Sequence, residues 1–302
     1  MELNFGRVEG LPPEEQQWLQ ELKYIYDYHR SANRKKRRYY NGKVTLNEVN
    51  LGIALPAGLG KLEIGCAWGA KTVDVLAGRS MFDGFVTENG TKSEDMDQIM
   101  KRNHLIAEYN KAVKEELKYG CAFAAVSGEE DDARVRFYSP HCGADSWNEL
   151  EGHILYGFDF EDARRDESDV TWSPEHVNFY TDTDIWELDR IGGTWYATQN
   201  PHDFGEPLIV ALIWDATNDK PFGQSRLKEP IRRLIQGYVR TVANATIGLE
   251  FATSPQKYLL GVSDEQYDML IDNKFNSMLE VFSTVPIIRR LGKSRISGNF
   301  RR

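Results

Sequence analysis

The sequence has few of the features that place a chain outside the ordinary globular class. Its three cysteines, Cys66, Cys121 and Cys142, are too few and too scattered for a disulfide framework, which indicates assembly in a reducing compartment. Its longest apolar run, residues 208–214, is far shorter than the roughly 20 residues that span a bilayer. Near-average glycine and proline exclude a collagen-like or low-complexity chain. We therefore expect a folded protein with no membrane partner.

Sequence signals for nucleotide and metal chemistry are also absent. Gly58, Gly60 and Lys61 form a glycine-rich string, but a phosphate-binding loop would need glycine in place of Leu55 and serine or threonine in place of Leu62. The sequence holds no G-x-G-x-x-G, no G-x-S-x-G, and no closely spaced pair of cysteines or histidines. The sequence thus predicts no catalytic residue, no cofactor and no metal.

Charge of one sign is concentrated in the middle of the chain. Residues 129–189 contain 18 acidic and 4 basic side chains, a local net charge of −14 against −9 for the whole chain. Basic residues cluster at 34–38 and after Arg289. An acidic chain is a poor candidate for non-specific coating of nucleic acid, which depends on Lys and Arg neutralising phosphates. Two functions stay open on these patterns, a hydrolase that uses carboxylates within 129–189 and a nucleic-acid-binding module that uses Arg34–Arg38. The interpretation we favour for the acids is a solvated surface, and for the basic run it is a solvated helix end next to buried tyrosines.

Hydrophobic periodicity predicts an α+β fold, with N-terminal helices, an antiparallel sheet and a long helix. Helical spacing begins at Pro12–Pro13 and recurs over 68–79 and 93–119. After Gly120 the period changes to two, and short segments separated by turn residues predict an antiparallel meander. The predicted strands are 121–126, 135–139, 153–160, 177–181, 185–189, 195–198 and 208–214. One apolar stripe from 227 to 250 then predicts a helix of about six turns.

Several uncommon strings occur in a fixed order over residues 39–261, and the most specific is Pro221–Leu227. The others are Tyr39–Gly42, Trp68 with Thr72–Asp74, Gly78–Arg79 and Gly84–Phe85, Leu117–Phe123, Tyr138–Pro140, Gly205–Val210, and Glu250 with Ala252, Ser254–Tyr258 and Gly261. Together they resemble the tailed-bacteriophage portal proteins of the Gp6-like group.

This resemblance implies a structural, non-enzymatic subunit of a dodecameric ring at one capsid vertex, through which DNA is packaged and ejected. Residues 1–222 would form a wing-like α+β domain, 223–252 the first stem helix and 253–302 the start of a clip. The resemblance also implies that a second stem helix, a tunnel loop and a crown would follow Arg302, so we expect the sequence to be a fragment, the product of a truncated gene, or one part of a protein whose remainder is a separate polypeptide. For this chain alone we expect mainly monomers or heterogeneous oligomers.

The resemblance also implies partners and a location. The partners are further copies of the chain, the terminase large subunit, the major capsid or scaffolding protein, the head-tail adaptor, and double-stranded DNA that passes without sequence specificity. Assembly would take place in the host cytoplasm, and the mature location would be the capsid vertex of the virion. We expect the acidic residues of 129–189 to lie on the outer wing surface.

Two sets of residues are the candidates for the assembly. Gly223 is expected to permit a close turn into the long helix, and Ser225 is expected to cap that helix. The candidate wing core is Trp68, Val73, Asp74, Phe85, Tyr119 and Phe123. The candidate stem or channel helix carries Gly223, Ser225, Arg226, Leu227, Leu234, Tyr238, Arg240 and Glu250.

Overall fold

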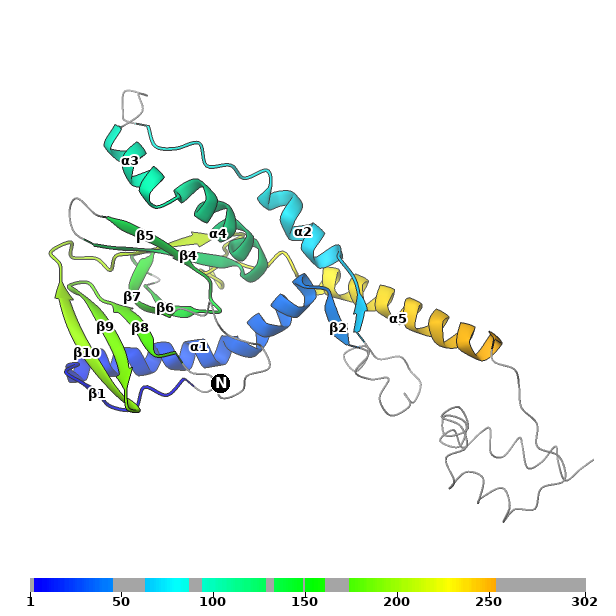
Figure 1. Ribbon diagram of the computed structural model, residues 1–302, viewed down its shortest axis with the longest axis horizontal. Helices are drawn as coiled ribbons and strands as arrows, with labels where there is room; N and C mark the ends of the chain where they lie inside the picture. The colour runs from blue at the N-terminus through cyan, green and yellow to red at the C-terminus, as the bar shows by residue number, and fades with distance from the viewer. Residues whose placement is uncertain are drawn as a thin grey trace, which may run out of the picture. The chain divides into compact units, whose positions relative to one another are not determined.

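The computed structural model describes residues 3–45, 63–86, 94–128, 133–148, 150–160 and 174–253 (Figure 1). The chain divides into two compact units. The first combines Met1–Lys43 with Cys66–Ile235, and the second combines Val44–Gly65 with Gln236–Arg302.

The first long element is helix α1, Pro13–Tyr40, and it begins where the sequence predicts. Pro13 occupies the first turn, where a missing N–H costs nothing, and Glu14 and Glu15 add favourable negative charge there. The buried line of the helix includes Leu19 and Leu22, one turn apart on the same face. Trp18 and Ile25 of the same helix are partly buried and pack against this core.

A six-stranded sheet forms the larger layer of the first unit, in the spatial order β1-β10-β9-β8-β7-β6. Neighbouring strands from β6 to β10 pair antiparallel, as a meander requires, whereas β1 adds to β10 in parallel. Neither β1 nor β6 is among the strands predicted from the sequence. The strands are β1 (Val8–Glu9), β6 (Gly143–Asn148), β7 (His153–Phe160), β8 (His176–Tyr180), β9 (Asp184–Ile191) and β10 (Thr194–Pro201).

A separate three-stranded sheet contains the two ends of the predicted meander. Its order is β11-β4-β5, with β4 at Cys121–Ser127, β5 at Arg134–Tyr138 and β11 at Ile209–Ile213. Both pairings are antiparallel, but β4 and β11 lie more than 80 residues apart in sequence. The single meander expected from the sequence is therefore wrong, because the first and last of its segments pair with each other in a second sheet.

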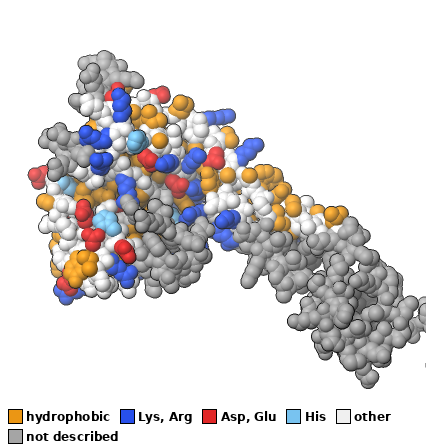
Figure 2. Space-filling model, viewed as in Figure 1, with side chains coloured by type: hydrophobic (Ala, Val, Ile, Leu, Met, Phe, Trp, Pro, Cys, Tyr) orange, Lys and Arg blue, Asp and Glu red, His pale blue; other side chains and the backbone are white. Residues whose placement is uncertain are grey.

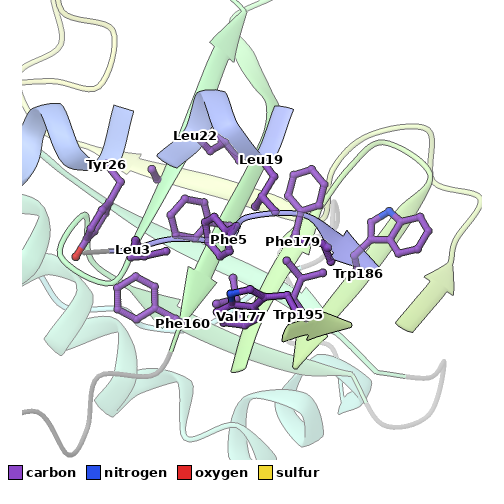
Figure 3. Packing of buried hydrophobic residues seen from close by; sticks show 14 of the residues in the cluster. Leu3, Phe5, Leu19, Leu22, Tyr26, Phe160, Val177, Phe179, Trp186 and Trp195 are labelled. Carbon is purple, nitrogen blue, oxygen red and sulfur yellow. The ribbon is translucent and has the colours of Figure 1, made fainter. Parts of the chain in front are cut away.

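The main core lies between α1, the N-terminal segment and one face of the six-stranded sheet (Figure 3). Leu22 and Tyr26 of α1 meet Phe158 and Phe160 of β7, and Tyr26 contacts Phe160 with a ring-centroid distance of 5.7 Å. Phe5 packs edge-on against Phe158. Aromatic side chains bury large apolar areas, so this layer supplies much of the hydrophobic stabilisation of the unit.

Three helices follow β3 in the sequence and precede β4. They are α2 (Trp68–Ala77), α3 (Glu94–Arg102) and α4 (Leu105–Tyr119). The continuous helix expected over 93–119 is wrong in one respect, because it breaks at Asn103–His104, where His104 takes a left-handed φ of 50°. α4 then ends at Gly120, as predicted, with φ 113°.

The second unit includes a two-stranded sheet of β2 (Lys43–Thr45) and β3 (Glu63–Gly65). The long helix predicted near the end is α5, Glu229–Thr253, which continues from the first unit into the second. These elements confirm the α+β class. The functional boundaries at 222/223 and 252/253 stay predictions.

Candidate functional site

The predicted wing core is only partly a core. Val73, Tyr119 and Phe123 are buried, but Trp68 is 49% and Phe85 38% exposed, so the prediction is wrong for these two. The reason lies in α2, whose buried line includes Gly69 and Val73. Trp68 is one position away from that line and therefore points about 100° to its side.

Asp74, the polar member of that set, belongs to a small network beneath α4. Its carboxylate accepts a hydrogen bond of 2.9 Å from the Tyr40 hydroxyl and lies 3.7 Å from Lys114 Nζ. The buried Lys118 ammonium lies 4.4 Å from the centroid of the Tyr40 ring and 2.5 Å from a Glu115 oxygen. Burial, and then the Asp74 hydrogen bond, raise the pKa of Tyr40 to about 12. The network holds the last turn of α4 against the end of α1.

The segment 223–228 is joined to the end of α4 by backbone hydrogen bonds, and we call this segment the joint. The Arg226 N–H donates to the Leu117 carbonyl at 2.8 Å, and the Trp214 N–H donates to the Gly120 carbonyl at 2.9 Å. Gly223 has φ 72° and lies so close to this carbonyl that a Cβ would stand 2.6 Å from its oxygen. The sequence-based role of Gly223 as a turn residue agrees with this geometry.

Ser225 differs from its predicted role. α5 begins at Glu229, so Ser225 is too far from the first turn to cap it. Its hydroxyl instead donates to the Lys118 carbonyl at 2.5 Å and accepts from the Leu227 N–H at 3.0 Å. Ser225 and Leu227 are both buried, so the hydroxyl satisfies two backbone groups at the joint. The Arg226 guanidinium lies 5.9 Å from the Trp214 ring centroid.

α5 carries one buried line with a repeat of four residues, through Ile235, Val239 and Ala243. Of the predicted stem residues, Leu234 is 61% exposed, Tyr238 is half-buried and Arg240 is exposed. The side chain of Glu250 lies outside the described residues. Hydrophobic side chains, drawn in orange, also gather on the visible surface of α5 (Figure 2). The helix thus has apolar residues beyond those that it buries.

Two buried carboxyl groups, from Asp145 and Asp159, lie between the two sheets. Asp145 Oδ1 accepts from the Tyr138 hydroxyl at 2.7 Å, and Asp159 Oδ1 accepts from the Tyr180 hydroxyl at 3.1 Å. An Arg136 nitrogen lies 3.0 Å from Asp159 Oδ2. Burial raises the pKa of both carboxyl groups, most strongly that of Asp145, where the Asp159 charge adds to the effect.

These two carboxyl groups bear on the hydrolase alternative. Their residues are only 2% and 0% exposed, so no substrate reaches them in this conformation. Within the part of the chain that the structure describes, no three His, Cys, Asp or Glu side chains are grouped to hold a metal ion. The acids at 129–132 and 161–169 lie outside the described residues. The outer-surface prediction is wrong for Asp145, Asp159 and Asp184, which are buried, whereas Asp182 and Glu187 are exposed.

The basic run 34–38 forms the end of α1. Arg34 and Lys35 are exposed, but Lys36 donates to the Tyr119 carbonyl at 2.8 Å and Arg37 lies 2.8 Å from His141 Nε2. Part of the run therefore fastens α1 to the rest of the unit. The basic tail after Arg289 lies outside the described residues.

All three cysteines are free thiols, and Cys142 is partly buried. Cys66 and Cys121 are buried free thiols, and burial raises the pKa of Cys121, which keeps it protonated. None of the helices in the described ranges combines the length and the apolar composition needed to cross a bilayer.

Comparison with known proteins gives one family. The family described as phage portal protein, SPP1 Gp6-like, matches residues 19–213, which run from α1 to the end of β11. The joint and α5 follow this range. A search of the curated proteins finds no match. Because the match covers most of the chain and most of the described first unit, the chain belongs to the SPP1 Gp6-like family of phage portal proteins.

Proposed function

We propose that the chain is a ring-forming portal subunit, in which 1–222 act as the wing, 223–252 as the first stem helix and 253–302 as the start of the clip. The observation that carries this proposal is the family match over α1 to β11, followed, after the joint, by a long helix with exposed apolar residues. The ring would occupy one capsid vertex and pass DNA during packaging and ejection.

The finer partners are proposed on the same basis. They are the terminase large subunit during packaging, the major capsid or scaffolding protein around the ring, and the head-tail adaptor afterwards. Double-stranded DNA would pass without sequence-specific contacts. A conduit has to release DNA as it slides, and an acidic chain with a net charge of −9 suits weak contact with phosphates. Catalysis would reside in a partner, since the buried Asp145 and Asp159 offer no open site.

Imaging and mass measurement test the ring. We expect the purified chain to be mainly monomeric when dilute and to form heterogeneous oligomers, in multiples of 34.6 kDa, as its concentration rises. Rings with a central hole in negative-stain images are expected when the sequence that follows the first stem helix in the family is supplied as well. The apolar residues on α5 favour such association, because exposed apolar area is buried between copies. A single 34.6 kDa species at every concentration would contradict the proposal.

A measurement of duplex DNA binding distinguishes the portal proposal from the alternative that the chain is a nucleic-acid-binding module. A conduit predicts weak binding at physiological ionic strength. Tight binding that falls steeply with added salt would favour a binding module centred on Arg34–Arg38.

A further inference from the structure

The two faces of the six-stranded sheet have different surroundings. Residues alternate between faces along a strand, so Trp186 and Leu188 of β9 face α1 and the main core, whereas Glu187 and Asp189 face the other side. On that other side, β11-β4-β5 pack over residues that include Ile154 and Tyr180. Among the described residues, Glu187 is exposed, so this outer surface of β9 is open to solvent. Because α1 packs against the face that carries Trp186 and Leu188, α1 and the outer surface of β9 lie on opposite sides of the sheet.

The outward side of α1 is aromatic and basic, and we call it the basic face, defined by Tyr24, Tyr28, Arg34 and Lys35. Tyr24 and Tyr28 are 71% and 72% exposed and stack with centroids 6.4 Å apart. Lys35 is seven residues beyond Tyr28 and follows the same outward line, with Arg34 beside it. From residue 30 to residue 38 the helix has six basic residues and no acidic residue. Tyrosine and arginine are among the residue types enriched at protein interfaces.

The outer side of β9 and β10, together with the turn that leads into β9, is opposite in charge, and we call it the acidic face, defined by Asp182 of that turn and by Glu187, Asp189 and Tyr196 of the strands. Tyr196 is 46% exposed and pairs directly with Asp189 across the two strands. Residues 174–206 hold seven acidic side chains and one arginine, a net charge of −6. The acidic face therefore matches the basic face in both its charge and its exposed aromatic side chains.

We propose that the basic face of one copy packs against the acidic face of the next copy, so that subunits add head to tail. This inference rests on the proposed ring function and names the surfaces through which copies meet. Complementary charge on opposite sides of one body favours a heterologous contact, which closes into a ring or continues as an open chain. A face-to-face dimer of either surface would instead oppose charges of the same sign.

Paired charge reversals give a decisive test. Variant one is Arg34→Glu with Lys35→Glu, and variant two is Asp182→Lys with Glu187→Lys; the four residues are exposed. Alone, each variant opposes like charges at every contact and should associate roughly tenfold more weakly than the native chain in sedimentation or light scattering at low salt. Mixed in equal amounts, the two should associate again, because every alternating contact regains opposite charges. Association of the native chain should weaken as salt rises.

A matched control for variant one makes the same change in net charge, −4, at another place on the surface. Lys71→Glu with Lys101→Glu reverses two exposed lysines on α2 and α3 and should associate like the native chain. Three outcomes overturn the proposal: variants that associate normally, a mixture that stays dissociated, or a native chain that stays monomeric at low salt. Normal rings from both single variants would leave the portal function standing and remove only this interface.

A second measurement needs no variant and so does not depend on the folding of one. Zero-length carbodiimide coupling joins a lysine amine to a carboxylate that it contacts. In a mixture of isotopically light and heavy native chains, we expect Lys35 to be coupled to Asp182, Glu187 or Asp189 of another copy. Absence of these mixed-isotope products, while the chains are associated, overturns the proposal.

Discussion

At the scale of single residues, the geometry at Gly223 explains why this position of the joint requires glycine. Its φ of 72° is in the left-handed region, and its Cα lies against the carbonyls of Trp214 and Gly120. A side chain there has to adopt an unfavourable backbone conformation and also push two carbonyl groups apart. Those carbonyls accept the backbone bonds that hold the joint, from the Gln224 N–H and the Trp214 N–H.

Gly223→Ala should therefore lower the free energy of unfolding by about 2–4 kcal/mol, measured by urea denaturation. Gly205→Ala is the matched control, since Gly205 has a similar φ of 71° but no atom within 4 Å of its Cβ position. It should cost only the backbone strain, about 1 kcal/mol. Equal losses for the two variants would show that close packing at the joint is not what requires glycine.

Burial of single residues was only partly predictable from the sequence. Trp68 was expected in the core because of its hydrophobicity, but Gly69 approaches the Tyr39 carbonyl so closely that this side of α2 faces inward. Asp145 looked like a surface acid, and no local signal marks it as buried. The space for it comes from its cross-strand neighbour Gly157, where a Cβ would collide with the Asp145 carboxylate.

At the scale of elements, Asn103, which lies at the break between α3 and α4, protects the edge of a sheet. β5 is an outer strand of its sheet. The Asn103 amide donates to the Ala133 carbonyl at 2.8 Å, and its oxygen accepts from the Val135 N–H at 3.0 Å. One side chain thus pairs with β5 as a neighbouring strand would, and it covers backbone groups that an open edge leaves unpaired.

Asn103→Ala removes both bonds and should lower the free energy of unfolding by about 1–2 kcal/mol. Hydrogen exchange at the Val135 amide should become faster. The control is Asn110→Ala at an exposed position of α4, where alanine favours the helix and should leave that amide unchanged. Unchanged exchange at Val135 in Asn103→Ala would contradict the edge-capping role.

The types of most elements could be predicted from the sequence, and their pairings could not. Periods of 3.6 and 2 depend on neighbouring residues, so the start of α1 and the approximate bounds of α2, α5 and the strands from β7 to β10 could be predicted. The left-handed turn at His104 has no such signal. The pairing of β4 with β11 joins segments far apart in the chain, and alternation within each strand carries no information about its partner.

At the scale of the whole molecule, the first unit is a layered body whose two sheets enclose ionisable groups. Asp145 faces Tyr138 of β5 and shares the inter-sheet space with Asp159 of β7 and Cys121 of β4. Asp145 Oδ2 has no hydrogen-bond partner among the described residues. A charged carboxylate in this position would be costly, so burial favours the protonated form and raises the pKa of Asp145 well above its usual range.

The burial of Asp145 predicts that the stability of the folded chain depends on pH through the proton on this one carboxyl group. The folded chain keeps a proton on Asp145 that the unfolded chain releases above about pH 4, so this group's contribution to stability falls as pH rises from there towards the raised pKa. The fall is about 1.4 kcal/mol per pH unit for one proton. Asp145→Asn keeps an acceptor for Tyr138 and should gain stability relative to the native chain as pH rises, in thermal melts between pH 5 and 8. Asp182→Asn, at an exposed position, should follow the native curve. Parallel curves for Asp145→Asn and the native chain would mean that Asp145 is ionised in the fold, and that the sheets pack around a charge.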